Sequence, residues 1–166
     1  SVAENPTNGI QYAILNQSAQ IGGTKILGIG FHLDATRVNQ IPFVLLQSPT
    51  KITSNPDVSF SADGKGLGVW HSGGQIHYRF LSSQGNPSAP AKFFTDTADA
   101  NSNPVSAFDS KKVVFVEAWT KGAGVFASAI DPLYATQEAE FKSIASANGM
   151  TVNADLSFDR ATGKSL

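Results

Sequence analysis

A repeated segment constrains the fold of this 166-residue chain more than any other sequence feature. The fullest copy is NPDVSFSADGKGLGVWHSGGQIHYRFL, residues 55–81, which predicts three short strands joined by turns at Asp63-Gly64 and Gly73-Gly74. Related segments are NPVSAFDS at 103–110 and NADLSFDRATG at 153–163. Repeats of roughly 20–50 residues are typical of propellers, solenoids and other arrays of small units.

Short apolar runs bounded by turn residues predict strands along the rest of the chain. These runs are 10–15, 25–33, 43–46, 92–95, 105–108, 113–119 and 125–130. Residues 136–147 have the composition of a helix with Thr136 as its N-cap. Their place in the repeat favours a strand around Phe141 instead.

The spacing of the copies divides the chain into three units. Ile10, Ile76 and Val125 mark equivalent positions that lie 66 and 49 residues apart. We expect one all-β domain of three four-stranded antiparallel repeats, at about 6–72, 73–121 and 122–166. The last copy stops one strand early, so we expect residues 1–5 to close it. In this alignment Glu4, Trp70 and Trp119 are equivalent.

The strands carry apolar residues on both faces. In residues 113–119, Phe115 and Trp119 alternate with Val114, Val116 and Ala118. A strand with one wet face would alternate between apolar and polar residues. The pattern therefore predicts sheets that are covered on both sides, as in stacked blades.

The residues NP-x-V-S, DG-x-G-x-G-V-W and G-x-I-x-Y-R-F-L of the 55–81 segment resemble the blades of bacterial extracellular β-propellers. The resemblance implies a four-stranded meander for each repeat and a secreted or cell-surface location, but no particular activity. Three blades are too few for a closed propeller, which usually has about four to eight.

We therefore expect half of a six-bladed ring, completed by a second copy or by a second half-propeller chain, or else a fragment of a longer chain. A single-chain β-trefoil is the alternative, because it also has three repeats and adjacent termini. The chain begins at Ser1, which suits a processed mature chain or a trimmed one.

Composition excludes several classes of function. The net charge is −1 and no stretch is strongly basic, which argues against nucleic acid as a partner. The chain has no cysteine, so it has neither disulfides nor thiolate metal sites. No apolar run approaches the ~18 residues of a membrane span.

Aromatic and basic side chains are the candidate ligand-binding residues. Trp70 and Trp119 occupy repeated positions where their rings would stack on sugars, although packing in the core is the alternative role. His71 and His77 lie beside Trp70 in the repeat. Arg79 is expected to face a ligand or to pair with an acid such as Glu117.

The loop around residues 96–101 is the one candidate metal site. Asp96, Asp99 and Asn101 place oxygen ligands close together, as calcium prefers, but their spacing is not that of an EF-hand, and a solvated turn is the alternative. The sequence indicates no other cofactor.

The function expected from these features is a non-enzymatic extracellular module that binds a glycan or a protein, in the manner of a lectin or adhesin, and associates with itself. A glycoside hydrolase, or an accessory fragment of one, is the first alternative. It would need two converging carboxylates, and Glu4, Glu117 and Asp131 are scattered along the chain. A β-trefoil lectin or inhibitor is the second alternative.

Overall fold

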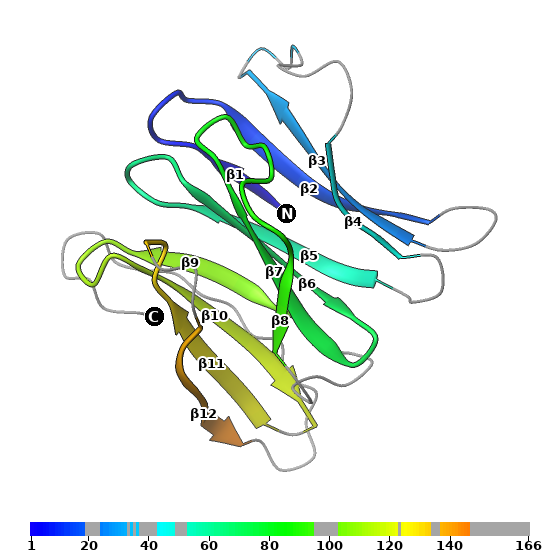
Figure 1. The fold of residues 1–166 in the computed structure, drawn as a ribbon, viewed down its shortest axis with the longest axis vertical. Helices are drawn as coiled ribbons and strands as arrows, with labels where there is room; N and C mark the ends of the chain where they lie inside the picture. The colour runs from blue at the N-terminus through cyan, green and yellow to red at the C-terminus, as the bar shows by residue number, and fades with distance from the viewer. Residues whose placement is uncertain are drawn as a thin grey trace.

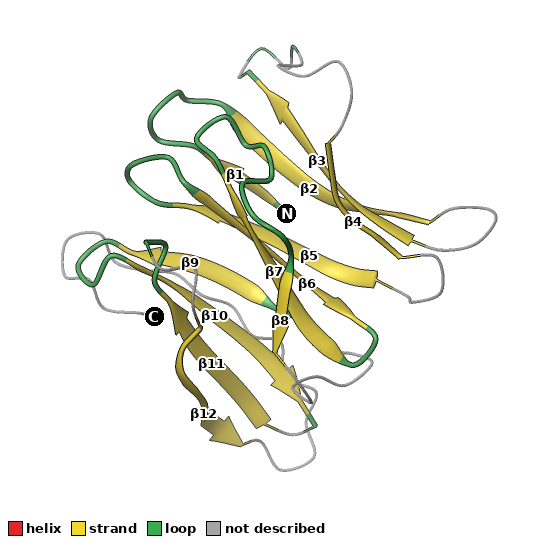
Figure 2. Cartoon of the chain, in the orientation of Figure 1, coloured by secondary structure: helices red, strands yellow, loops and turns green. Residues whose placement is uncertain are grey.

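The protein folds into three antiparallel sheets of four strands each, stacked face to face (Figures 1 and 2). The structure is a computed structural model that describes residues 1–18, 24–32, 34, 36, 43–48, 53–94, 103–122, 124–133 and 137–146. None of these residues is helical. The prediction of an all-β chain of three four-stranded repeats is therefore confirmed.

Each sheet is a meander of consecutive strands. The first sheet contains β1 (Val2–Glu4), β2 (Gln11–Ser18), β3 (Thr24–Phe31) and β4 (Phe43–Ser48). The second contains β5 (Thr53–Phe60), β6 (Gly66–Ser72), β7 (Gln75–Leu81) and β8 (Lys92–Phe94). The third contains β9 (Val105–Asp109), β10 (Val114–Lys121), β11 (Gly124–Ile130) and β12 (Gln137–Ser146).

The described strands pair only within their own sheet. A β-trefoil closes a barrel by pairing strands that belong to different repeats, so the trefoil alternative does not fit this arrangement. Residues 153–163, which supplied the third copy of the repeated segment, lie outside the described residues.

The phase of the first repeat differs from the expected one. Val2 pairs with Ala13 and Glu4 pairs with Gln11, so β1 is the first strand of the first sheet rather than part of the last repeat. The expected boundaries after residues 72 and 121 fall at hairpin turns within the second and third sheets. Glu4 therefore lies on a first strand, and it is not equivalent to the tryptophans on the second strands β6 and β10.

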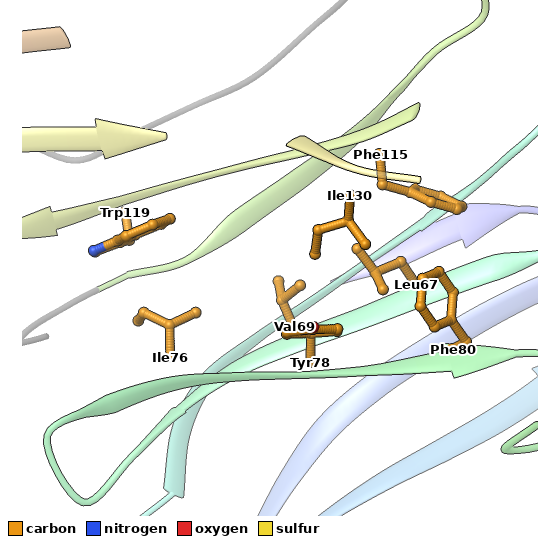
Figure 3. Close-up of a cluster of buried hydrophobic side chains, with 8 residues drawn as sticks. All are labelled: Leu67, Val69, Ile76, Tyr78, Phe80, Phe115, Trp119 and Ile130. Carbon is orange, nitrogen blue, oxygen red and sulfur yellow. The ribbon is translucent and has the colours of Figure 1, made fainter. Parts of the chain in front are cut away.

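Two apolar clusters hold the three sheets together. Ile14 and Ile26 of the first sheet pack on Val58, Trp70 and Leu81 of the second. The other cluster joins the second and third sheets (Figure 3) and contains Leu67, Val69, Ile76, Tyr78, Phe80, Phe115, Trp119 and Ile130.

The second sheet is thus covered on both faces, as the sequence predicted. Every residue of β6 is buried. On β10, Phe115 and Trp119 are fully buried against the second sheet, whereas Val114 and Val116 on the opposite face are only half-buried. Ala118 and Thr120, on the same face as Val114 and Val116, are buried.

Candidate functional site

The two tryptophans occupy equivalent positions on β6 and β10, and both are fully buried. Each ring stacks on its cross-strand partner. Trp70 lies 5.9 Å from the ring of His77, and Trp119 lies 6.2 Å from the ring of Phe126, measured between ring centroids. These contacts leave neither indole open to a sugar, and they favour the packing role that was the alternative.

The other candidate ligand residues serve local contacts. His71 is buried on β6, and a ring nitrogen of His77 lies 3.2 Å from the carbonyl oxygen of Ser72. Arg79 is half-buried, and its Nε donates a hydrogen bond of 2.6 Å to the carbonyl of Ala89. The expected pair with Glu117 is not formed, because neither carboxyl oxygen of Glu117 has a hydrogen-bond partner.

Asp96, Asp99 and Asn101 lie outside the described residues. Within the parts of the chain that are described, no three His, Asp or Glu side chains lie together as a metal site would require. Because its three residues are not described, the calcium site stays a prediction.

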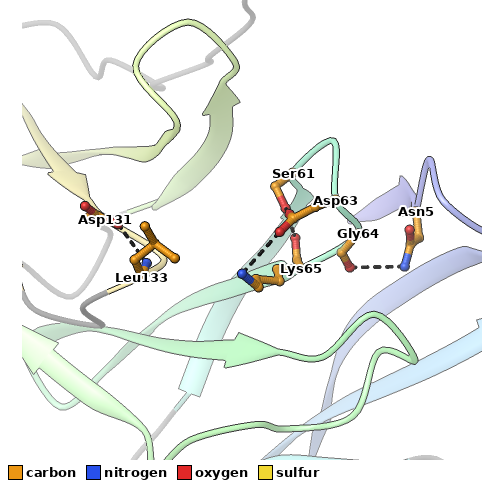
Figure 4. A network of polar contacts seen from close by, with 7 residues as sticks. All are labelled: Asn5, Ser61, Asp63, Gly64, Lys65, Asp131 and Leu133. Carbon is orange, nitrogen blue, oxygen red and sulfur yellow. Dashed lines mark hydrogen bonds and ion pairs between the residues drawn. The ribbon is translucent and has the colours of Figure 1, made fainter.

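The three scattered carboxylates serve different parts of the fold. Glu4 accepts a hydrogen bond of 2.8 Å from Gln11 at the surface. Asp131 accepts one of 2.7 Å from the backbone N–H of Leu133 after β11 (Figure 4). Glu117 is fully buried between the second and third sheets. The structure therefore does not bring these three carboxylates together as the catalytic pair that a glycosidase requires.

Glu117 is the most unusual ionisable group in the described part of the chain. It lies on the same face of β10 as Phe115 and Trp119, and desolvation by burial raises its pKa well above the ordinary value of 4.5. Burial, and then the charge of Glu117, raise the pKa of Tyr78 to about 12. Burial thus favours the neutral form of the Glu117 carboxyl over the charged form.

A cavity of about 440 Å³ lies where the three sheets meet. Its walls are the first strands β1, β5 and β9 with the turns that follow them, so each sheet contributes one wall. These strands are the edge strands of their sheets. The main lining side chains are Glu4, Ser59, Phe60, Ser106, Phe108 and Ser110.

Hydrogen bonds fix the wall between β5 and β9. The Ser59 hydroxyl donates to the Ser106 hydroxyl at 2.9 Å. A carboxylate oxygen of Asp57 accepts a bond of 2.7 Å from the backbone N–H of Ser106. The two edge strands are therefore joined by side chains rather than by a ladder, and the polar wall keeps its shape without a ligand.

The turns beside the cavity are held by a buried amide (Figure 4). Asn5 follows β1 and is fully buried. Its Nδ2 donates to the carbonyls of Gly64 at 3.2 Å and Ser83 at 2.7 Å, and its Oδ1 accepts from the N–H of Thr7 at 3.0 Å. One side chain thus fixes turns of the first and second sheets to each other.

A second polar cluster stabilises the β5–β6 turn. Asp63 accepts a hydrogen bond from the hydroxyl of Ser61, and it forms an ion pair of 3.1 Å with Lys65. The bond from Ser61 lowers the pKa of Asp63, and the proximity of Lys65 adds to the effect. The turn therefore stays ordered on the rim of the cavity, which Ala62 also lines.

The cavity residues were not predicted from the sequence. The signal available was the repeat itself, because Ser59 and Phe60 lie in the segment aligned with the one that holds Ser106 and Phe108. Glu4 joins them only through the pairing of β1 with β2, which the sequence alignment had placed elsewhere.

Comparisons of this chain with protein-family models, with curated proteins and with solved structures find no match. No helix long and apolar enough to cross a membrane is present in the described parts of the chain.

Proposed function

We propose that this protein is a non-enzymatic extracellular module of propeller-like blades that binds a glycan or protein partner and associates with copies of itself. The single observation that supports the proposal most is the group of apolar residues on the outward face at each end of the stack of sheets. The resemblance of residues 55–81 to blades of extracellular propellers supports the location and the class of fold.

The outward face of the third sheet is the first of these ends. It is opposite the face of Phe115 and Trp119, because side chains alternate along a strand. The cross-strand register of β9, β10 and β11 brings the following small and apolar side chains together on it: Val105, Ala107, Val116, Ala118, Val125 and Ala127. In Figure 1 no described strand lies beyond this face, although Ala118 on it is only 2% exposed.

The outward face of the first sheet is the second end. Tyr12 and Ile14 of β2 are buried on the side of the second sheet, so their neighbours point outward. The register of β1, β2 and β3 places these apolar residues on that outward face: Val2, Ala13, Leu15, Leu27, Ile29 and Phe31. Val2 is 58% exposed.

Antiparallel sheets that face water usually carry polar side chains on that side. Here both outward faces mix apolar residues with polar ones. The same register places Gln11, Gln17 and Lys25 on the outward face of the first sheet, and Asp109 and Thr120 on that of the third. A second copy of the chain offers each face its complement, because the first sheet of one copy would cover the third sheet of the other. Two such contacts are equivalent by two-fold symmetry and close the assembly.

Lysine substitutions on the two faces test this assembly by analytical ultracentrifugation. We expect Leu15→Lys and Val116→Lys each to give a mass near that of one chain, because each places a charge inside both contacts of the pair. Leu133→Lys is the matched control and keeps the wild-type mass, since Leu133 is 71% exposed in a turn.

Mixing the two monomeric variants gives a sharper result. The intact third sheet of Leu15→Lys meets the intact first sheet of Val116→Lys, so the mixture should recover association through one contact. A face that paired with its own copy would give no recovery. Two variants that both keep the wild-type mass would contradict the proposed assembly.

A further inference from the structure

The cavity between β1, β5 and β9 combines an open set of backbone groups with polar and aromatic side chains. Edge strands present unpaired N–H and C=O groups on one side. The hydroxyls of Ser59, Ser106 and Ser110 lie among these groups, and the rings of Phe60 and Phe108 are only half-buried. A volume of about 440 Å³ lies within the range of small-molecule sites.

The charge of the cavity narrows the ligand class. None of the described residues that line it is Lys, Arg or His, so nothing there attracts an anion. Among the described residues that line the cavity, Glu4 supplies the only carboxylate, and its oxygens have room for donors besides Gln11. Asp57 is already committed to Ser106, so a multiply charged cation would find one acid and not a cluster.

We propose that this cavity binds a neutral glycan, with the sugar hydroxyls on Glu4 and the serines and an apolar sugar face on Phe60 or Phe108. This inference rests on the proposed binding function and names its site and its ligand class. A sugar matches the lining because it carries many hydroxyls around a ring with apolar C–H faces. A neutral sugar also carries no charge, so it does not require a basic side chain in the lining.

In the two-copy assembly proposed above, the first strands would line the axis. The cavities of both copies would then open toward a common space, and a branched or repeating glycan would reach two sites at once. Paired sites of this kind raise the apparent affinity without a new contact.

The test uses neutral methyl glycosides of glucose, galactose and mannose, followed by NMR of the isotope-labelled full chain. The proposal predicts shifts of the backbone amides of Ser59, Ser106 and Ser110 with at least one of these sugars. Lactose should bind more tightly than sialyllactose, because the added acid would meet Glu4. Equal or tighter binding of sialyllactose would overturn the neutral preference.

Variants decide whether the shifts arise in the cavity. Ala62→Trp fills it from an exposed turn and should abolish binding, as should Ser110→Trp from the opposite wall. Glu4→Gln should weaken binding about tenfold through the loss of a charged acceptor. Gln84→Trp is the matched control at an exposed turn outside the cavity and should bind as the wild type does.

Circular dichroism confirms that each variant is folded. If the sugar still binds to both Ala62→Trp and Ser110→Trp, the cavity is not the site. Glycan binding by the protein would then still hold. The absence of any shift with all three sugars, in a chain that still associates in pairs, would overturn the inference and leave the assembly standing.

Discussion

Glu117 is fully buried among the side chains that join the second and third sheets, and neither of its oxygens has a hydrogen-bond partner. An isolated buried carboxylate is costly, so burial raises the pKa of this group and favours its protonated form in the folded chain. Below the ordinary pKa of 4.5, both the folded and the unfolded chain hold this proton. Above it only the unfolded chain releases the proton, until the pH reaches the raised pKa of the folded state.

The free energy of unfolding should therefore fall as the pH rises above about 5, by up to about 1.4 kcal/mol per pH unit from this group. Glu117→Gln should remove this part of the pH dependence, because an amide of similar shape does not ionise. Urea unfolding at several pH values measures both. Glu4→Gln, at an exposed glutamate, is the control that should retain the dependence, and a Glu117→Gln profile parallel to that of the wild type would refute the explanation.

Asn5 should contribute strongly to stability for its size. Asn5→Ala removes the bonds to Gly64, Ser83 and Thr7 and leaves buried backbone groups unpaired. We expect a loss of about 2 kcal/mol or more in the free energy of unfolding. Asn8→Ala is the comparison, since Asn8 also bonds to Ser83 but at the exposed surface, and it should cost clearly less. Equal losses of unfolding free energy in Asn5→Ala and Asn8→Ala would contradict the role of burial at Asn5.

The hairpin of β6 and β7 depends on the turn between Ser72 and Gln75. Gly73 and Gly74 have φ angles of 59° and 78°, which are the left-handed values of a type I′ turn. Gly73→Asn should be tolerated, since Asn-Gly suits this turn. Gly74→Val should cost about 1–2 kcal/mol or more, because a branched side chain resists positive φ. Thermal unfolding of the two variants compares them directly, and similar midpoints would argue against the turn assignment.

At the scale of strands, hydrophobic pattern and turn residues were sufficient for most of the fold. The strand around Phe141 shows the repeat correcting local propensity, since residues 137–146 form β12 although their composition suits a helix. Residues 1–5 were expected to close the last repeat, whereas β1 pairs with β2, because three residues carry too little pattern to indicate their sheet. The pairing of β1 with β2 is local and spans only the turn of residues 5–10.

The candidate site was much less predictable than the strands. Trp70 and Trp119 were candidate sugar-binding residues because they are aromatic. The alternation of side chains along β6 and β10 instead directs both rings into the core. The cavity depends on edges of three sheets that meet in space. Phe60 and Phe108 are equivalent in the repeat, but Glu4 lies outside that alignment. Such a site follows from the stacking of the sheets and becomes visible only with the topology.

The whole molecule is an open stack of three sheets with a group of apolar residues on the outward face at each end. The central claim is that two chains pair through these ends, and the mass of the wild-type protein in solution tests it most directly. Light scattering over a range of concentrations should give twice the 17.5 kDa of one chain at the higher concentrations, with dissociation on dilution. A mass equal to one chain throughout that range would contradict the claim.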